Sequence, residues 1–142
     1  MKKKSIRYLL FGMIGIALFI SLKTFHDYSE KNLDEVIQYK PNNFISLTIR
    51  DKSGDVEWTT YNKDAVEKLL TFLSNYRVKK ISDRAYDDGG LSSDKRFEII
   101  IKHSKAANLF ALIQEDEVHI YKKGYYQVLN GPIDMHWVKR FQ

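Results

Sequence analysis

Cysteine is absent from the 142-residue chain, and this absence removes several kinds of chemistry at once. Without thiols the chain can form no disulfide framework, thiolate nucleophile, thiolate zinc site or lipid attachment through an N-terminal cysteine. Proline and glycine are scarce, with two and seven residues, while 44% of the residues are hydrophobic and 13% are aromatic. This composition indicates a globular chain with room for one domain of roughly 100 residues behind an N-terminal segment.

Acidic residues are missing from the first part of the chain, where Lys2, Lys3, Lys4 and Arg7 precede Lys23. These four cations account for most of the formal charge of +5, because the remaining 19 basic residues face 18 acidic ones, a net charge of +1. A nearly neutral domain offers little attraction to a phosphate backbone. We therefore expect no nucleic acid partner.

Residues 6–25 form an apolar segment of the length that a membrane span requires. A helix rising about 1.5 Å per residue carries such a segment across roughly 30 Å, the thickness of the hydrocarbon layer. The strictly apolar run, residues 8–22, is also short enough for a secretory signal, yet residues 23–29 contain no pair of small residues typical of a cleavage site. We predict an uncleaved single-pass anchor in the lipid bilayer; a cleaved signal and a buried helix are the alternatives.

The distribution of lysine predicts the orientation of this anchor. Lysines cluster before the apolar segment and a mixed-charge stretch follows it, which favours a cytoplasmic N-terminus and an extracytoplasmic domain at the cell membrane. The chain then divides into a basic cytoplasmic tail, a transmembrane anchor, a stalk or linker and an extracytoplasmic α+β domain, at residues 1–5, 6–25, 26–43 and 44–142. The stalk is polar, with Leu33, Val36 and Ile37 at the spacing of one short helical piece.

The domain opens with a strand and a predicted hairpin. Residues 44–50 alternate strictly, which places Ile45, Leu47 and Ile49 on one face, and residues 56–60 continue the alternation after a turn. A helix should follow from an N-cap at Asn62, with apolar positions that share one helical face, namely Val66, Leu69, Leu70, Leu73 and Tyr76.

The second half of the domain has the pattern of a strand meander. Strands are expected over residues 97–103, 109–114, 118–122 and 125–129, and Asp134 can cap a last short helix. The predicted order is ββαββββα, an α+β domain in which one helix packs across an antiparallel sheet.

A polar loop over residues 82–96 carries the candidate metal ligands Asp83, Asp87, Asp88 and Asp94. Their carboxylates could bind calcium at a bend made by two glycines, but the spacing is not that of an EF-hand and no glutamate closes the loop. A solvated surface loop is the favoured interpretation. We predict no metal site and no cofactor, and whether the loop has a function stays open.

Aromatic residues are the candidates for binding. Tyr121, Tyr125 and Tyr126 flank two lysines and could stack on bases or sugars, although tyrosine and lysine are also ordinary residues of a hairpin tip. Together with Trp58 and Trp137 they could instead form a protein-binding face, which is a commoner use of such side chains.

No arrangement of residues predicts catalysis. The four histidines form neither H-x-x-x-H nor H-E-x-x-H, and the chain has no G-x-S-x-G elbow. We therefore predict a non-catalytic, membrane-tethered domain that binds another envelope or membrane protein. The alternative is an enzyme or sensor for a small envelope ligand. An extended apolar patch would favour the first, and a deep pocket lined by two or more titratable groups the second.

The meander also carries a resemblance. Residues 97–102 (FEIIIK) and 118–126 (VHIYKKGYY), followed by Gly131, Pro132 and Ile133, resemble small membrane-anchored extracytoplasmic proteins of Gram-positive bacteria. The likeness covers about residues 44–133. The function of that family is unknown, so the resemblance implies location and architecture and no catalytic residue.

Overall fold

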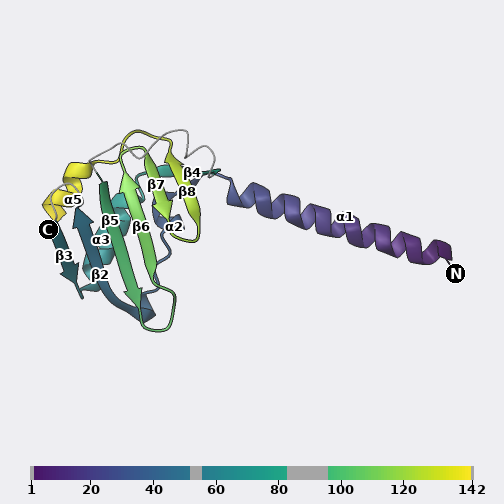
Figure 1. Cartoon of the computed structure of the whole chain (residues 1–142), viewed down its shortest axis with the longest axis horizontal. Helices are drawn as coiled ribbons and strands as arrows, with labels where there is room; N and C mark the ends of the chain where they lie inside the picture. Colours follow the sequence, from purple (N-terminus) through teal and green to yellow (C-terminus); the bar gives the residue numbers. More distant parts are fainter. Residues whose placement is uncertain (1, 52–55, 83–95, 142) are drawn as a thin grey trace.

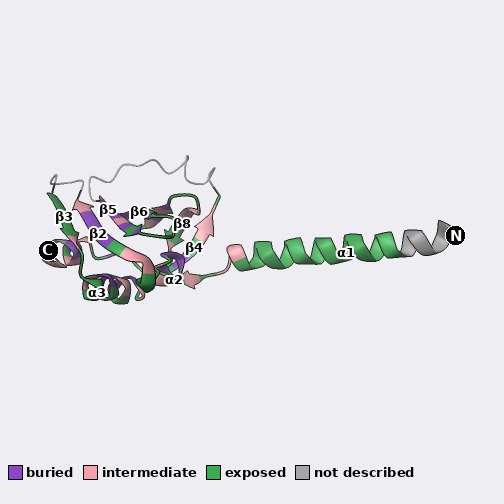
Figure 2. Ribbon diagram, turned by 90° about the horizontal axis from the view of Figure 1, so that it is seen from below, coloured by how far each residue is buried: buried purple, intermediate pink, exposed green. Residues whose placement is uncertain are grey.

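The computed structural model describes residues 2–51, 56–82 and 96–141, which form a long N-terminal helix and a sheet domain (Figure 1). Helix α1 (Lys2–Asp27) extends away from the domain as a single rod. Its segment Tyr8–Asp27 is long and apolar enough to cross a membrane, and no side chain in it is buried (Figure 2). The sequence prediction of a helix with these properties is confirmed.

Among the described residues, eight strands form one antiparallel sheet. In the order in which they lie side by side, they are β1 (Lys31–Asn32), β4 (Arg77–Ile81), β8 (Gly124–Val128), β7 (Glu117–Ile120), β6 (Leu109–Gln114), β5 (Arg96–His103), β2 (Phe44–Asp51) and β3 (Val56–Thr60). The β2–β3 hairpin and the meander from β5 to β8 confirm the α+β prediction in its broad form.

Four short helical segments accompany the sheet in the described part of the chain: α2 (Leu33–Val36), the 3₁₀ turn η1 (Pro41–Asn43), α3 (Lys63–Leu73) and α5 (Met135–Phe141). Helix α3 lies across one face of the sheet (Figure 2). The Asn62 side chain accepts a hydrogen bond from the Asp64 N–H at 2.9 Å, so Asn62 is the N-cap that the sequence predicts. Phe72 is buried on this helix, whereas Leu70, expected on the same face, is only half-buried.

The core lies between the sheet and these helices. Leu47 and Ile49 of β2 face Ile99 and Ile101 of β5, and all four side chains are 0% exposed. Ile45 was expected on the same face, but the strand pairing is irregular between Phe44 and Ser46, and Ile45 is 45% exposed. A bulge inserts one unpaired residue and reorients the side chains before it. The prediction for Ile45 is therefore wrong.

The segment that the sequence assigned to a stalk contributes to the fold. Strand β1 pairs with β4, and Leu33 and Ile37 are 0% and 1% exposed in the core. The Leu33 N–H donates to the Tyr76 carbonyl at 2.9 Å, and Lys123 Nζ donates to the Val36 carbonyl at 2.7 Å. Residues 31–37 thus belong to the packed domain.

The predicted order ββαββββα is incomplete, because it omits β1, α2, η1 and β4. Strand β4, which the predicted order omits, is paired on both sides, with β8 and β1. The core also receives side chains from three helices rather than one, since Leu33 of α2 and Val138 of α5 are buried beside those of α3. After α1 the observed order is β1, α2, η1, β2, β3, α3, β4, β5, β6, β7, β8 and α5.

Candidate functional site

Strand β3 forms one free edge of the sheet. Within the described residues it pairs only with β2, through five residue pairs from Leu47–Thr60 to Asp51–Val56. The opposite edge is β1, which is only two residues long. An edge strand presents backbone N–H and C=O groups that can pair with another chain, and a very short edge strand offers few of them. Strand β3 therefore offers more unpaired backbone groups than β1 does.

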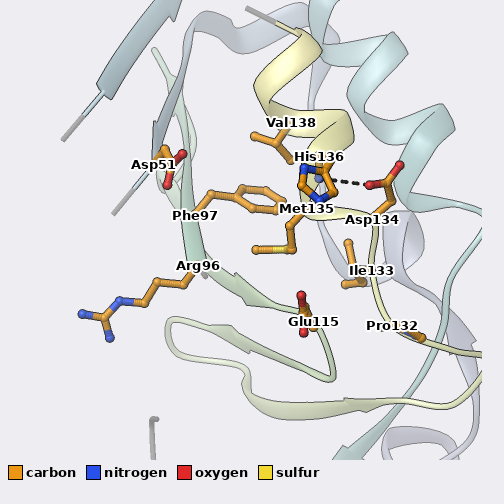
Figure 3. A pocket seen from close by; sticks show the side chains of 10 residues that line it. All are labelled: Asp51, Arg96, Phe97, Glu115, Pro132, Ile133, Asp134, Met135, His136 and Val138. Atoms are coloured by element: carbon orange, nitrogen blue, oxygen red, sulfur yellow. Dashed lines mark hydrogen bonds between the residues drawn. The ribbon is translucent and has the colours of Figure 1, made fainter. Parts of the chain in front are cut away.

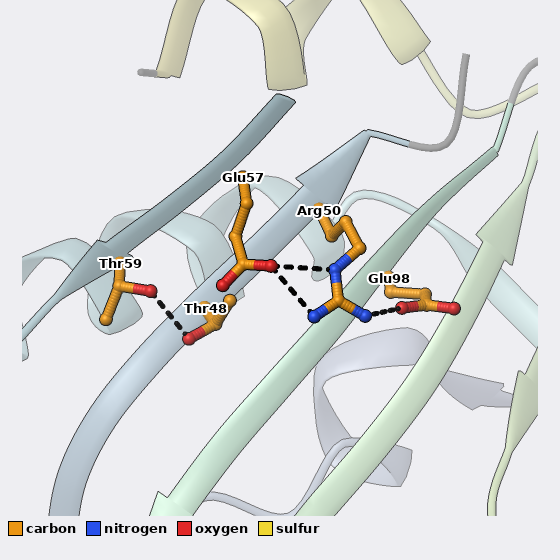
Figure 4. A network of polar contacts seen from close by, with 5 residues as sticks. All are labelled: Thr48, Arg50, Glu57, Thr59 and Glu98. Atoms are coloured by element: carbon orange, nitrogen blue, oxygen red, sulfur yellow. Dashed lines mark hydrogen bonds and ion pairs between the residues drawn. The ribbon is translucent and has the colours of Figure 1, made fainter. Parts of the chain in front are cut away.

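Polar side chains hold β3 on the face of the sheet that is turned away from α3 (Figure 4). The hydroxyls of Thr48 and Thr59 lie 2.9 Å apart across the hairpin. The Arg50 guanidinium donates to Glu57 on β3, with distances of 2.8 and 2.9 Å, and to Glu98 on β5 at 2.9 Å. The hydrogen bond and the charge of Glu57, with a smaller contribution from Glu98, raise the pKa of Arg50. These contacts connect three neighbouring strands and keep the edge strand in register.

An aromatic groove lies on the other face of β3, where α3 and α5 meet the sheet. We call it the edge groove; its volume is about 680 Å³ and its lining includes Trp58, Thr60, Asn62, Lys68, Trp137 and Phe141. Trp58 meets Phe141 edge to face, with ring centroids 5.5 Å apart. Trp137 stacks on Phe72 at 3.9 Å with an interplanar angle of 2°. The two tryptophans that the sequence singles out thus line one groove, and both are half-buried.

Helix α5 is fixed beside this groove by Asp134. One carboxylate oxygen accepts hydrogen bonds from the backbone N–H groups of His136 at 2.9 Å and Trp137 at 3.3 Å. The other accepts from Arg140 at 3.3 Å. Asp134 therefore caps the last helix as predicted, and the cap orients the Trp137 side chain toward α3.

A second cavity, the α5 pocket, opens on the other side of α5, between this helix and the start of β5 (Figure 3). Its volume is about 340 Å³, within the range of small-molecule sites. The lining combines apolar side chains (Phe97, Pro132, Ile133, Met135 and Val138) with ionisable ones (Asp51, Arg96, Glu115, Asp134 and His136). No group of three His, Asp or Glu side chains among the described residues could hold a metal ion. This pocket suits a small amphipathic molecule.

Of the three candidate tyrosines, Tyr121 and Tyr125 line one hollow, whereas Tyr126 does not reach the surface. Tyr121 is 59% exposed beside Phe110, with ring centroids 6.3 Å apart. Tyr125 is half-buried and stacks on His119 at 4.2 Å. Tyr126 is only 7% exposed and belongs to the core, so it cannot serve as a surface residue. Four strands lie between β8 and β3, which separates these tyrosines from the edge groove.

His103 is a buried histidine whose two ring nitrogens are both engaged. Nδ1 lies 3.1 Å from the Ala107 carbonyl, and Nε2 accepts from the Lys40 N–H at 3.4 Å. The neutral tautomer with its hydrogen on Nδ1 satisfies both contacts. His103 therefore connects two backbone segments. The candidate metal ligands Asp83, Asp87, Asp88 and Asp94 lie outside the described residues.

Outside α1, the exposed large apolar side chains of the described residues come from separate segments of the chain. They include Ile45, Tyr61 and Leu129 in separate segments. Sequence reasoning identified Trp58 and Trp137 but missed Phe72, because Phe72 fell outside the predicted helical face. It also missed the α5 pocket, whose walls come from four separate segments of the chain.

Comparison with protein-family models, curated proteins and solved structures finds no match to this chain. The resemblance to anchored proteins of Gram-positive bacteria therefore stays a prediction.

Proposed function

We propose that this chain is a membrane-tethered, non-catalytic domain that binds another envelope or membrane protein by adding a strand of that protein to β3. The free edge of β3 beside the edge groove is the observation that carries the proposal. Strand addition derives its affinity from backbone hydrogen bonds and its specificity from pockets for alternate side chains. It therefore needs no extended apolar patch.

The tether in this proposal is α1. Its 20 residues Tyr8–Asp27 would reach about 30 Å as a helix, which matches the hydrocarbon layer. The hydroxyls of Ser21 and Thr24 donate to carbonyls four residues earlier, both at 2.9 Å, so the helix satisfies them without water. Because the lysines at the start of α1 favour the cytoplasm, the sheet domain lies on the extracytoplasmic side of the membrane.

The partner segment would be extended, with apolar side chains on alternate positions. Trp58 and Thr60 of β3 lie on the same face of the sheet as their partners Ile49 and Leu47, the face that carries the edge groove. A strand paired beside β3 would direct every second side chain toward that groove, because side chains alternate along a strand. Aromatic or branched apolar side chains fit its tryptophan walls best.

Site-directed photo-cross-linking in intact cells tests this mode of binding. A photoreactive residue in place of Tyr61, which is 76% exposed directly after β3, should give one discrete cross-linked protein. Val56→Lys should abolish that product, because a lysine on an edge strand opposes strand addition. Ile45→Lys is the matched control, since Val56 and Ile45 are both 45% exposed. Loss of the product in both variants, or in neither, refutes strand addition at β3.

The orientation has its own test. A reporter enzyme fused after Gln142 should be active only in the extracytoplasmic compartment, and the mature chain should retain residues 6–25. Activity in the cytoplasm alone refutes the orientation, and a mature N-terminus beyond residue 23 refutes the anchor.

A second candidate function is a sensor for a small envelope ligand, and the α5 pocket favours it. The observation is a pocket of about 340 Å³ with an apolar floor and five ionisable side chains around it. Met135→Trp would fill this pocket without touching the edge groove. A small molecule that raises the melting temperature of the full chain but not of Met135→Trp would support the sensor, and cross-linking at Tyr61 separates the two functions.

A further inference from the structure

A hollow lies at the point where α1 joins the domain. Its volume is about 730 Å³, and its lining includes Tyr28, Lys80, Tyr121, Lys122 and Lys123; we call it the anchor-side hollow. Tyr28 is the first residue after α1, Lys80 belongs to β4, and the other three form the turn between β7 and β8. Strands β4 and β8 occupy the side of the domain from which α1 leaves (Figure 1). The hollow is thus next to the end of the helix.

The charge of the anchor-side hollow is of one sign. Three of its lining residues are lysines, and none of the described residues that line it is acidic. Lys80 Nζ lies 6.0 Å from the centroid of the Tyr28 ring, and Lys122 Nζ lies 5.7 Å from that of Tyr121. Within the described structure neither ammonium is paired with a carboxylate. Two ammonium groups of the hollow therefore lie beside tyrosine rings rather than beside carboxylates.

A fourth lysine, Lys31, lies near the lining lysine Lys123. Lys123 donates its Nζ hydrogen to the Val36 carbonyl at 2.7 Å. Burial lowers the pKa of Lys123, and the positive charge of Lys31 lowers it further. The second effect means that Lys31 and Lys123 are close enough to repel each other. An anion at the hollow would relieve that repulsion.

The backbone of the turn holds Lys122 in an unusual conformation. Its φ is 66°, in the left-handed region, where glycine and asparagine are the residues that fit with least strain. A lysine here costs backbone strain and places its ammonium over Tyr121. Residues with strained backbone conformations cluster at functional sites.

We propose that the anchor-side hollow binds the phosphate groups of anionic lipids in the membrane that holds α1. This inference rests on the tether of the proposed function and is independent of the partner at β3. If α1 spans the bilayer, Tyr28 lies in the headgroup layer, which extends several ångströms beyond the hydrocarbon on each side. A lysine near a membrane surface that carries anionic lipid gains about fivefold in binding, and tyrosine is enriched at the same depth.

The test is amine footprinting of the wild-type full chain in lipid vesicles. The protein is reconstituted into vesicles of phosphatidylcholine alone or mixed with phosphatidylglycerol, and the labelling rate of each lysine is read by mass spectrometry. We expect Lys80 and Lys122 to react about fivefold more slowly in the anionic vesicles, and high salt to restore their rates. Lys63 and Lys68, both exposed on α3, are the internal controls and should react equally in both.

A charge-removal variant separates binding from folding. The double variant Lys80→Gln and Lys122→Asn removes two charges, and asparagine tolerates the left-handed turn, so the domain should stay folded. In the wild type we also expect anionic lipid to slow the labelling of Lys123, the third lining lysine, and in this variant that protection should be lost. The matched control, Lys63→Gln with Lys68→Gln, removes the same charge from α3 and should leave that protection unchanged.

Three results would overturn the inference. Equal labelling rates in both vesicles, in a chain that floats with them, refute headgroup binding and leave the tether intact. Equal protection by inorganic phosphate in phosphatidylcholine vesicles assigns the hollow to a soluble anion instead. A chain that does not float with vesicles refutes the tether, and this inference with it, while cross-linking at Tyr61 still reports on β3.

Discussion

Replacing Leu33 with alanine tests where the folded domain begins. Leu33 follows α1 by only a few residues, yet its side chain is 0% exposed. Truncation removes buried methyl groups and leaves a cavity, which costs about 2–5 kcal/mol for a buried leucine. A domain of this size has a total stability of about 5–15 kcal/mol, so the loss is a large fraction of it. Ile45→Ala, at a position that is 45% exposed, should cost less than about 0.5 kcal/mol.

Thermal unfolding of the full chain in detergent micelles can measure this difference. Both tryptophans, Trp58 and Trp137, lie in the domain, so tryptophan fluorescence reports its unfolding without a contribution from α1. Because 1 kcal/mol shifts the melting temperature of such a domain by about 4–8 °C, Leu33→Ala should lower it by roughly 10 °C or more. Equal shifts for Leu33→Ala and Ile45→Ala would refute the core placement and restore residues 26–43 as a stalk.

Asp134→Ala should lower the stability by about 1 kcal/mol in urea unfolding, because α5 loses its cap, whereas Asp134→Asn should retain most of it. Burial raises the pKa of Tyr126, and the charge of Asp27 raises it further. The folded state therefore holds the phenolic proton more tightly than the unfolded chain, whose tyrosines have a pKa near 10.0, so stability should fall as the pH rises above that value. Equal falls in Tyr126→Phe and wild type would contradict this explanation. Arg50→Met should lower the stability only slightly, and less still at high salt, since the Arg50 side chain is 38% exposed; a large, salt-independent loss would show that its contacts are not surface pairs.

The spacing of apolar residues predicted those helices and strands that are long enough to show a repeating pattern. The β2–β3 hairpin alternates over several residues on each side, and α3 has a cap and three turns, so local sequence is sufficient for both. Strand β1 and helix α2 have two and four residues, too few for a periodic pattern. Their position depends on pairing with β4, more than 40 residues away, and on burial against the meander. Such contacts are properties of the fold rather than of the segment.

The candidate site was predictable only in part, for a related reason. Trp58 and Trp137 stood out as large aromatics, but nothing in the sequence shows that they line one groove between β3 and α5. For the adjacent tyrosines, strand alternation requires that one of Tyr125 and Tyr126 face the core, yet the choice depends on the register with β7. Cavities form where separate segments meet, so the α5 pocket and the anchor-side hollow required the structure.

The junction between α1 and β1 also determines how a mechanical load would enter the domain. Only residues 28–30 separate Asp27 from Lys31, so tension on the helix reaches β1 with almost no slack. Strand β1 is held to β4 by two residue pairs, Lys31–Val78 and Asn32–Arg77. A pull along α1 would part these pairs first, then draw Leu33 and Ile37 out of the core, while the β2–β3 edge at the far side of the sheet is loaded last. The domain would therefore yield at its tether before it yields at its binding edge.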